Sequence, residues 1–186
     1  NCINNLNPAT GELIATIPKS DFNDVDLAVN AAKKAFPLWS NLTINERANW
    51  LNKIANELEK RFDEVAKLES KDTGKPITLA KKVDATRSVS NFRFFANLIE
   101  ELENPEFEMD DAIKTIIRKP SGIAGLITPW NLPLYLLSWK VAPALVMGNC
   151  VIAKPSELTP LTANLLAEVI SDIGLPKGVF NLIHGY

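Results

Sequence analysis

Three polar side chains stand in two short turns that each follow an apolar run of residues. Asn131 lies between Pro129 and Pro133 in the first turn, and Lys154 and Glu157 lie in the second. A fixed amide N–H stabilises an oxygen atom that gains negative charge in a reaction, and a carboxylate accepts hydrogen bonds from ligand hydroxyl groups. Open α/β sheets place ligand-binding groups just beyond the carboxyl ends of their strands. The two turns therefore indicate a catalytic or binding site.

Each turn is predicted to connect a strand of a parallel sheet with a helix. Strands and helices alternate after Gly122, at residues 123–127, 134–147, 151–153, 161–173 and 179–183. Such alternation predicts parallel strands joined by right-handed helical crossovers. The strands are short and apolar, which is typical of a sheet covered on both faces. We therefore expect an α/β fold in which residues 121–186 form part of a Rossmann-like parallel sheet.

The residues before this sheet are predicted to be mainly helical. A turn at residues 7–12 and a short strand at residues 13–17 come first. Thr43 and Glu46 form a capping box, which marks the start of a helix, and Gly74 is of the type that commonly ends one. Apolar residues at helical spacing predict helices over residues 21–36, 43–62, 64–73 and 77–103.

Composition and charge exclude several classes of protein. The 186 residues are 46% hydrophobic and 23% charged, which is typical of a globular protein. The net charge of −2 indicates no basic surface for nucleic acid or for an anionic membrane. Cys2 and Cys150 are far apart in sequence, which argues against a disulfide scaffold or a zinc site. We therefore expect a cytoplasmic protein in a reducing compartment, with no metal ion.

Four segments of the chain resemble the aldehyde dehydrogenase superfamily. They are NPATGE at residues 7–12, TPWNLP at 128–133, GNCVIAKPSELTP at 148–160 and GLPKGVFN at 174–181. The segments follow the order of the family pattern, and the resemblance covers essentially the whole chain. Members of the family oxidise an aldehyde to a carboxylic acid with NAD or NADP, after a cysteine thiolate attacks the aldehyde. The resemblance implies the N-terminal part of an NAD-dependent enzyme of the hydrolytic branch.

The resemblance assigns Asn131 to the stabilisation of the oxyanion that forms from the aldehyde oxygen. The residues alone leave an alternative, because asparagine is also a preferred residue for capping the helix that follows. By resemblance, Leu132, Leu136 and Trp139 border the tunnel through which the aldehyde enters. Ordinary core packing explains the same apolar residues equally well.

The resemblance also places the cofactor against both turns. Lys154 and Glu157 match family positions that bind the adenosine ribose. A carboxylate accepts hydrogen bonds from the ribose hydroxyl groups but repels a 2′-phosphate, so we expect NAD rather than NADP. The alternative is a solvated charge pair in a loop. The residues expected to bind the cofactor are Ile127, Thr128, Pro129, Trp130, Lys154, Ser156 and Glu157.

Residues 107–120 resemble the family segment that leaves the cofactor domain to build the oligomer interface. This implies a homodimer or homotetramer of the full-length protein. The residues themselves predict a connecting loop at 101–111 and a strand at 112–119, whose edge is unpaired unless another element covers it. The expected division is 1–106 for the helical part, 107–120 for the oligomerisation strand and 121–186 for the first half of the sheet.

Part of the catalytic machinery that the resemblance implies has no counterpart in this chain. The family's glycine-rich segment would begin at about Gly185, and its nucleophilic cysteine and general-base glutamate would lie farther downstream, so we expect the 186-residue chain to be inactive by itself. Cys150 precedes an apolar strand, where free cysteine usually behaves as a small buried apolar residue. His184 resembles a position in a semialdehyde-oxidising branch. Two alternatives stay open: a CoA-acylating or reductive member of the superfamily, and a truncated, non-catalytic protein that binds nucleotide or assists assembly.

Overall fold

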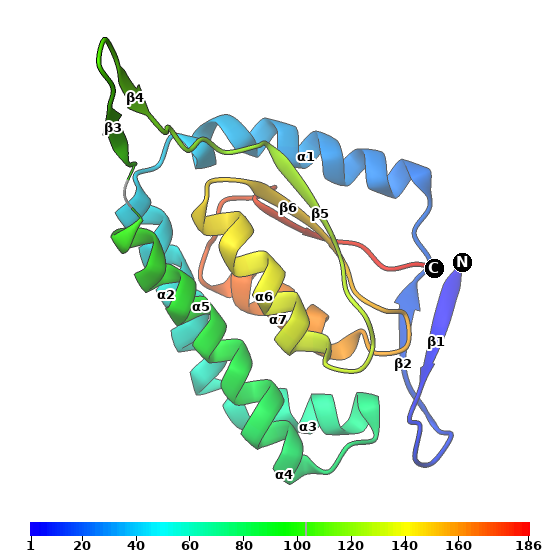
Figure 1. The fold of residues 1–186 in the computed structure, drawn as a ribbon. Coiled ribbons are helices and arrows are strands. Elements are labelled where there is room, and N and C mark those ends of the chain that lie inside the picture. Colours follow the sequence, from blue (N-terminus) through cyan, green and yellow to red (C-terminus); the bar gives the residue numbers. More distant parts are fainter. Residues whose placement is uncertain (103) are drawn as a thin grey trace.

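A three-stranded parallel sheet has helices on both faces. The computed structural model describes residues 1–102 and 104–186. The strands follow the order β5-β6-β7, with β5 at Ile123–Ile127, β6 at Cys150–Lys154 and β7 at Phe180–Leu182. On one face lie the crossover helices α6 (Pro133–Val146) and α7 (Leu161–Asp172), and on the other lies α1 (Phe22–Ser40) (Figure 1). The expected α/β fold with a partial Rossmann-like sheet is confirmed.

Further helices pack outside α6 and α7, namely α2 (Ile44–Lys60), α3 (Phe62–Thr73) and α5 (Thr86–Leu98). Helix α2 begins with the predicted capping box, in which Thr43 N donates to Glu46 Oε2 at 2.7 Å and Glu46 N donates to Thr43 Oγ1 at 3.2 Å. Helix α3 ends at Gly74, whose φ of 74° is left-handed. No helix among the described residues has the length and apolar character that crossing a bilayer requires.

The predicted helix over residues 77–103 is divided into four shorter pieces. They are α4 (Ile77–Leu79), the π-helical turn η1 (Ala80–Ala85), α5, and the 3₁₀ turn η2 (Ile99–Glu101). The spacing of apolar residues does not reveal a single π-helical turn, in which hydrogen bonds span five residues instead of four, so the sequence predicted one continuous helix. The predicted end of this helix, residue 103, lies outside the described residues.

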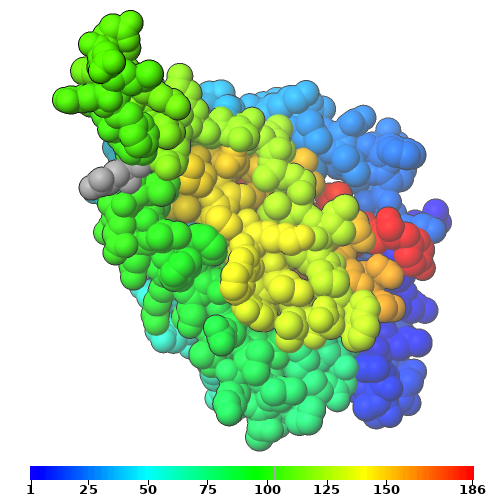
Figure 2. Space-filling view, viewed as in Figure 1, coloured from blue at the N-terminus to red at the C-terminus, as the bar shows by residue number. Residues whose placement is uncertain are grey.

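Two hairpins complete the fold. Strand β1 (Cys2–Leu6), which the sequence did not predict, pairs antiparallel with β2 (Leu13–Pro18). Strand β3 (Glu106–Glu108) pairs with β4 (Ile113–Thr115). The predicted strand over 112–119 is present as the shorter β4, with β3 covering one of its edges, whereas the prediction of a loop over 101–111 is wrong at residues 106–108. Acidic composition concealed β3, because cross-strand pairing rather than residue type stabilises so short a strand. Every residue of β3 and β4 is exposed, and Figure 2 shows this hairpin standing away from the body.

Helix α6 is held at its carboxyl end by side chains from α1 and α2. Trp39 Nε1 donates to Leu145 O at 3.0 Å, and Arg47 Nε donates to Val146 O at 2.7 Å. Arg47 is buried and also donates to Leu42 O. A cation at this end complements the helix dipole and satisfies carbonyl groups that the helix itself leaves unpaired. Arg47 therefore ties the outer helices to the helix that begins at the candidate site.

Replacing Arg47 by methionine should lower the free energy of unfolding by about 2–3 kcal/mol, because buried carbonyl groups lose their donor. Lys60 on the same helix offers a matched control, since it forms an exposed ion pair with Glu57 at 2.8 Å. Lys60→Met should cost less than about 1 kcal/mol. Urea unfolding of the parent and both variants measures the difference, and equal losses would contradict the role given to Arg47.

Candidate active site

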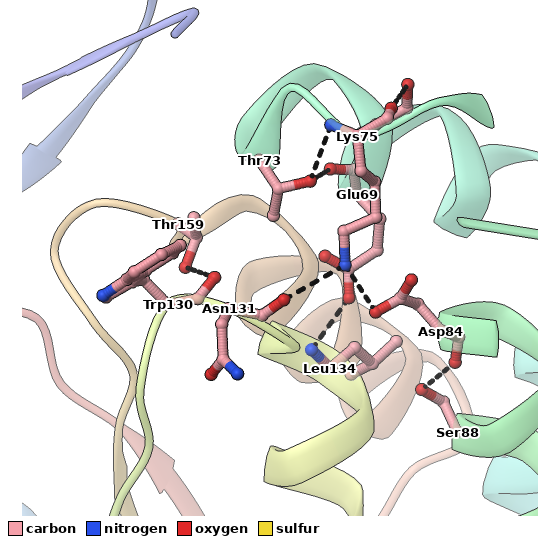
Figure 3. Close-up of polar contacts among 10 residues, drawn as sticks. Glu69, Thr73, Lys75, Asp84, Ser88, Trp130, Asn131, Leu134 and Thr159 are labelled. Atoms are coloured by element: carbon pink, nitrogen blue, oxygen red, sulfur yellow. Dashed lines mark hydrogen bonds and ion pairs between the residues drawn. The ribbon is translucent and has the colours of Figure 1, made fainter. Parts of the chain in front are cut away.

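The two predicted turns lie side by side at the carboxyl ends of β5 and β6. Thr128 N donates to Lys154 O at 3.2 Å, which continues the pairing of the two strands. Thr159 Oγ1 forms a longer bond, 3.4 Å, with Trp130 O and so joins the second turn to the first (Figure 3). The structure therefore brings the polar residues of both turns to one edge of the sheet.

The side chain of Asn131 points away from the neighbouring Lys75, Glu69 and Asp84 (Figure 3). Asn131 is exposed, and within the described part of the chain its amide has no hydrogen-bond partner (Figure 3). The N-cap of α6 is Leu132, and no side chain at that position caps the helix. The helix-capping alternative for Asn131 is therefore wrong. Its amide remains available to a ligand.

A carboxyl group from α3 caps α6 instead. Glu69 is fully buried, at 0% exposure, and its Oε1 accepts from Leu134 N at 2.9 Å. Pro133 has no N–H, so Leu134 carries the first N–H of the helix. Burial raises the pKa of Glu69 to about 8; the bond from Leu134 N opposes the rise, and the nearby Asp84 adds to it. Near neutral pH Glu69 is therefore mostly protonated.

A second carboxyl group of α3 caps α7. Asp72 Oδ2 accepts from Leu161 N at 2.8 Å, and Asp72 Oδ1 accepts from Asn5 Nδ2 at 2.6 Å. Burial raises the pKa of Asp72 to about 6, against the lowering effect of these two bonds. Helix α3 therefore bonds to the N-terminal ends of both crossover helices. Each of these helices begins next to one turn of the site.

A lysine beneath the first turn bonds to its backbone. Lys75 Nζ donates to Asp84 Oδ1 at 2.8 Å and to Asn131 O at 3.2 Å (Figure 3). Asp84 is fully buried. Among the described residues, Asp84 Oδ2 and Glu69 Oε2 have no hydrogen-bond partner, and no group of three His, Cys, Asp or Glu side chains is arranged to hold a metal ion. Lys75 thus supplies positive charge beside two buried carboxyl groups.

The residues predicted to bind the cofactor differ in their exposure. Ile127 and Trp130 are 68% and 58% exposed, and Pro129 is exposed as well. Glu157 is half-buried. Thr128 and Ser156 are buried; Ser156 Oγ accepts from Leu158 N at 3.2 Å, whereas Thr128 Oγ1 has no hydrogen-bond partner among the described residues. Cofactor contacts remain a prediction for all of these residues.

Lys154 bonds to backbone carbonyl groups of two loops. Its Nζ donates to Gly185 O at 2.8 Å and to Pro155 O at 3.2 Å. The neighbouring His184 is buried, with Nε2 3.1 Å from Asn164 Oδ1. Burial and the charge of Lys154 lower the pKa of His184, which favours its neutral form. Lys154 therefore holds the segment that follows β7.

An open cavity of about 460 Å³ adjoins the carboxyl ends of β5 and β6. Apolar side chains of α1 and the sheet line it, together with Ile127 and Lys154. Gly125 faces this cavity, and an added Cβ there would meet no atom within 4 Å. The cavity has the apolar lining and the few polar groups that are typical of small-molecule sites.

The residues predicted to border a substrate tunnel lie at the start of α6 and on it. Leu132 and Leu136 are half-buried, whereas Trp139 is 49% exposed. The Trp139 ring meets that of Tyr135 edge-to-face, with the centroids 5.6 Å apart. A half-exposed aromatic surface is not part of the core, and the tunnel assignment stays a prediction.

Sequence reasoning missed Glu69, Lys75 and Asp84. The one available signal is the position of Glu69 on the buried face of α3, which also carries Val65 and Ala66. Charged residues are almost never fully buried without partners, so an acidic residue on an apolar face is a candidate for a buried bond. Leu134, the partner of Glu69, is 65 residues away, and Asn131, one partner of Lys75, is 56 residues away, so nothing local reveals these two contacts. Asp84, the other partner of Lys75, is only nine residues away.

A parallel sheet with polar turns at its carboxyl edge defines an α/β protein of the open-sheet class, in which ligands bind at that edge. The chain belongs to the aldehyde dehydrogenase family, whose profile matches residues 1–186. It is 46% identical over 185 residues to 2-aminomuconic semialdehyde dehydrogenase of Homo sapiens, covering 98% of this chain and 38% of that protein. It is 44% identical over 187 residues to 2-hydroxymuconic semialdehyde dehydrogenase of Pseudomonas sp. strain CF600, covering 97% and 38%.

Solved structures agree with this assignment. PnpE from Pseudomonas sp. WBC-3 is 41% identical, with a TM-score of 0.95 over 100% of this chain and 38% of that one. A second structure of PnpE, in complex with nicotinamide adenine dinucleotide, has the same TM-score of 0.95. The chain spans about 38% of the length of these relatives and corresponds to their N-terminal part.

Replacing Glu69 by glutamine should make stability less dependent on pH. The fold raises the pKa of Glu69 from 4.5 to about 8, so the folded protein keeps a proton that the unfolded chain releases. The stability that Glu69 contributes is fully present below about pH 4.5 and is lost as the pH rises to about 8. Glutamine is uncharged and still offers an acceptor to Leu134 N. The variant should therefore gain stability relative to the parent across this range.

Urea unfolding at pH 5 and pH 8 measures this effect. The unfolding free energy of Glu69→Gln minus that of the parent should be larger at pH 8 than at pH 5 by about 2–4 kcal/mol. Asp72 titrates in both proteins, so its own contribution largely cancels; its charge adds only a minor part to the raised pKa of Glu69. A difference that stays constant with pH would show that Glu69 does not titrate as a buried carboxyl group.

Proposed function

We propose that this chain is part of an enzyme that oxidises aldehydes to carboxylic acids with NAD, in which Asn131 stabilises the oxyanion. The observation that carries the proposal is the exposed amide of Asn131 at the carboxyl edge of the sheet, which makes no hydrogen bond to the described residues because Glu69 caps α6 in its place. Negative charge develops on the aldehyde oxygen when a nucleophile attacks the carbonyl carbon. A donor already fixed in place stabilises that charge without reorganisation.

The cofactor of the proposal is NAD, which when bound accepts the hydride. The apolar cavity beside Ile127 and Lys154 fits the flat, uncharged parts of a dinucleotide. The half-buried carboxylate of Glu157 fits the ribose hydroxyl groups and disfavours a 2′-phosphate. The solved relative in complex with nicotinamide adenine dinucleotide supports a cofactor of this class.

The nucleophile of the proposal is not one of the two cysteines of this chain. Cys150 is buried, and burial raises the pKa of its thiol to about 11, so the reactive thiolate is scarce at neutral pH. Cys2 is exposed on β1, outside the two turns of the site. The 186-residue chain by itself is accordingly proposed to be inactive. Both thiols are free, which fits the cytoplasmic location that we propose.

The substrate class that we propose is a semialdehyde, an aldehyde that also carries a carboxylate. The support comes from relatives named 2-aminomuconic and 2-hydroxymuconic semialdehyde dehydrogenases. Leu132, Leu136 and Trp139 are proposed to border the entrance for the aldehyde, since they present partly exposed apolar surface at the start of α6 and along it, directly after Asn131 in the chain.

The assembly that we propose is a homodimer or homotetramer built through residues 107–120. Phe107, Met109 and Ile113 are 49%, 61% and 66% exposed on the hairpin that stands away from the body. Large apolar side chains gathered on one projecting element are typical of an interaction surface. An exposed strand edge also offers backbone groups to a partner strand.

Replacing Asn131 by alanine in the full-length enzyme should slow the burst of NADH formation about 10²–10³-fold, the usual effect of losing one oxyanion donor. The affinity for NAD should stay unchanged, since the donor acts only as charge develops. Asn97→Ala, at an exposed asparagine of α5, is the matched control and should keep the parental rate. Stopped-flow absorbance measures the burst. A normal burst in Asn131→Ala would contradict the role of Asn131.

Replacing Glu157 by glutamine should reduce the preference for NAD over NADP by about tenfold or more, because the charge that repels the 2′-phosphate is removed. Ratios of kcat/KM with the two cofactors, measured on the full-length enzyme, test the prediction. Glu168→Gln, on the exposed face of α7, is the control for a general loss of negative charge. An unchanged ratio, or a parental preference for NADP, would exclude Glu157 as the selecting group.

A further inference from the structure

We infer that Lys75, Asp84 and Glu69 are positioning residues for Asn131, which hold the backbone of the first turn so that the amide of Asn131 faces the site. The inference rests on the proposed function, in which this amide stabilises the oxyanion. It gives residues from the helical part of the chain a role in a site that lies at the carboxyl edge of the sheet.

The backbone of the first turn is held by side chains from separate parts of the chain. The contacts join Lys75 Nζ to Asn131 O at 3.2 Å, Glu69 Oε1 to Leu134 N at 2.9 Å, and Thr159 Oγ1 to Trp130 O at 3.4 Å (Figure 3). The turn cannot shift without breaking at least one of them. With the backbone held, only the side-chain torsions of Asn131 are left to orient its amide.

Lys75 is itself held in place by the end of α3. Gly74 takes a left-handed φ of 74°, which turns the chain sharply after the helix. Ser70 Oγ donates to Lys75 O at 2.7 Å, and Lys75 N donates to Thr73 Oγ1 at 3.4 Å. The Lys75 side chain therefore starts from a fixed backbone and reaches Asn131 with little freedom.

Stability alone does not explain the Lys75–Asp84 pair. Their side chains are 12% and 0% exposed, and the desolvation of a buried ion pair commonly cancels its attraction. Apolar side chains of similar volume would fill the same space at no lower stability. Apolar side chains could not donate a hydrogen bond to the Asn131 carbonyl. The bond from Lys75 Nζ to Asn131 O therefore accounts for a lysine at this position.

A double-mutant cycle on the full-length enzyme tests the inference through the burst of NADH formation. Lys75→Met should slow the burst at least about tenfold, since small displacements of a catalytic group are costly, and should leave the Kd for NAD within about twofold. In the Asn131→Ala background the same replacement should slow the burst less than about twofold, because the group that Lys75 positions is already absent.

Lys81→Met is the matched control. Lys81 pairs with Asp63 at 2.7 Å, but both side chains are exposed, at 46% and 70%. This replacement removes a lysine–aspartate pair without touching the turn, and it should leave the burst unchanged.

Equal slowing by Lys75→Met in both backgrounds, or no slowing in the parent, overturns the inference. A slow Asn131→Ala enzyme beside a fast Lys75→Met enzyme defeats only the positioning role. A fast Asn131→Ala enzyme defeats the proposed role of Asn131 and the inference with it. If Lys75→Met does not fold, Asp84→Asn keeps the shape of the pair, and the same cycle with that variant distinguishes the same outcomes.

Discussion

Helix α6 cannot satisfy its first N–H group by itself, and the site depends on how that group is satisfied. Pro133 has no N–H, and Leu132 at the N-cap has no side-chain acceptor, so Leu134 N needs an acceptor from another element. Glu69 provides it from α3, at 2.9 Å. This bond places the start of α6 against the helical part of the chain. Because Glu69 caps the helix, the side-chain amide of the neighbouring Asn131 is not needed for capping.

Glu69, Lys75 and Asp84, next to the first turn, are polar although they are largely buried. The directionality of their hydrogen bonds explains why polar groups stand there. An apolar contact tolerates sliding, whereas a hydrogen bond weakens steeply when its angle or distance changes. Burying a charged group is unfavourable. Glu69 avoids this because burial raises its pKa to about 8, which favours the uncharged form, and Lys75 and Asp84 offset it by forming an ion pair. The same low-polarity surroundings strengthen each bond that is made. Such a cluster gives the turn one position where an apolar cluster would permit several.

Much of the fold follows from local patterns, and most of the support for the site does not. The capping box of Thr43 and Glu46 and the helix end at Gly74 were predictable because their chemistry lies within a few residues. The parallel sheet was predictable from alternating apolar runs, which also placed Asn131 in a turn at the carboxyl end of a strand, whereas the role proposed for Asn131 rests on the resemblance to the family. Strands β1 and β3 escaped prediction because their stability comes from pairing. Glu69 and Lys75 escaped it because their partners lie on elements that only the fold brings near.

Helix α3 spaces the starts of the two crossover helices. Glu69 and Asp72 are three residues apart on this helix, and they cap α6 and α7 respectively. Three residues of an α-helix rise about 4.5 Å, so the pitch of α3 sets the offset between the starts of the two crossover helices. The distance between the two turns is thus set by α3, which belongs to neither turn. An insertion of one residue between Glu69 and Asp72 would rotate one carboxyl group by about 100° relative to the other, and it would separate the two halves of the site without altering any residue in them.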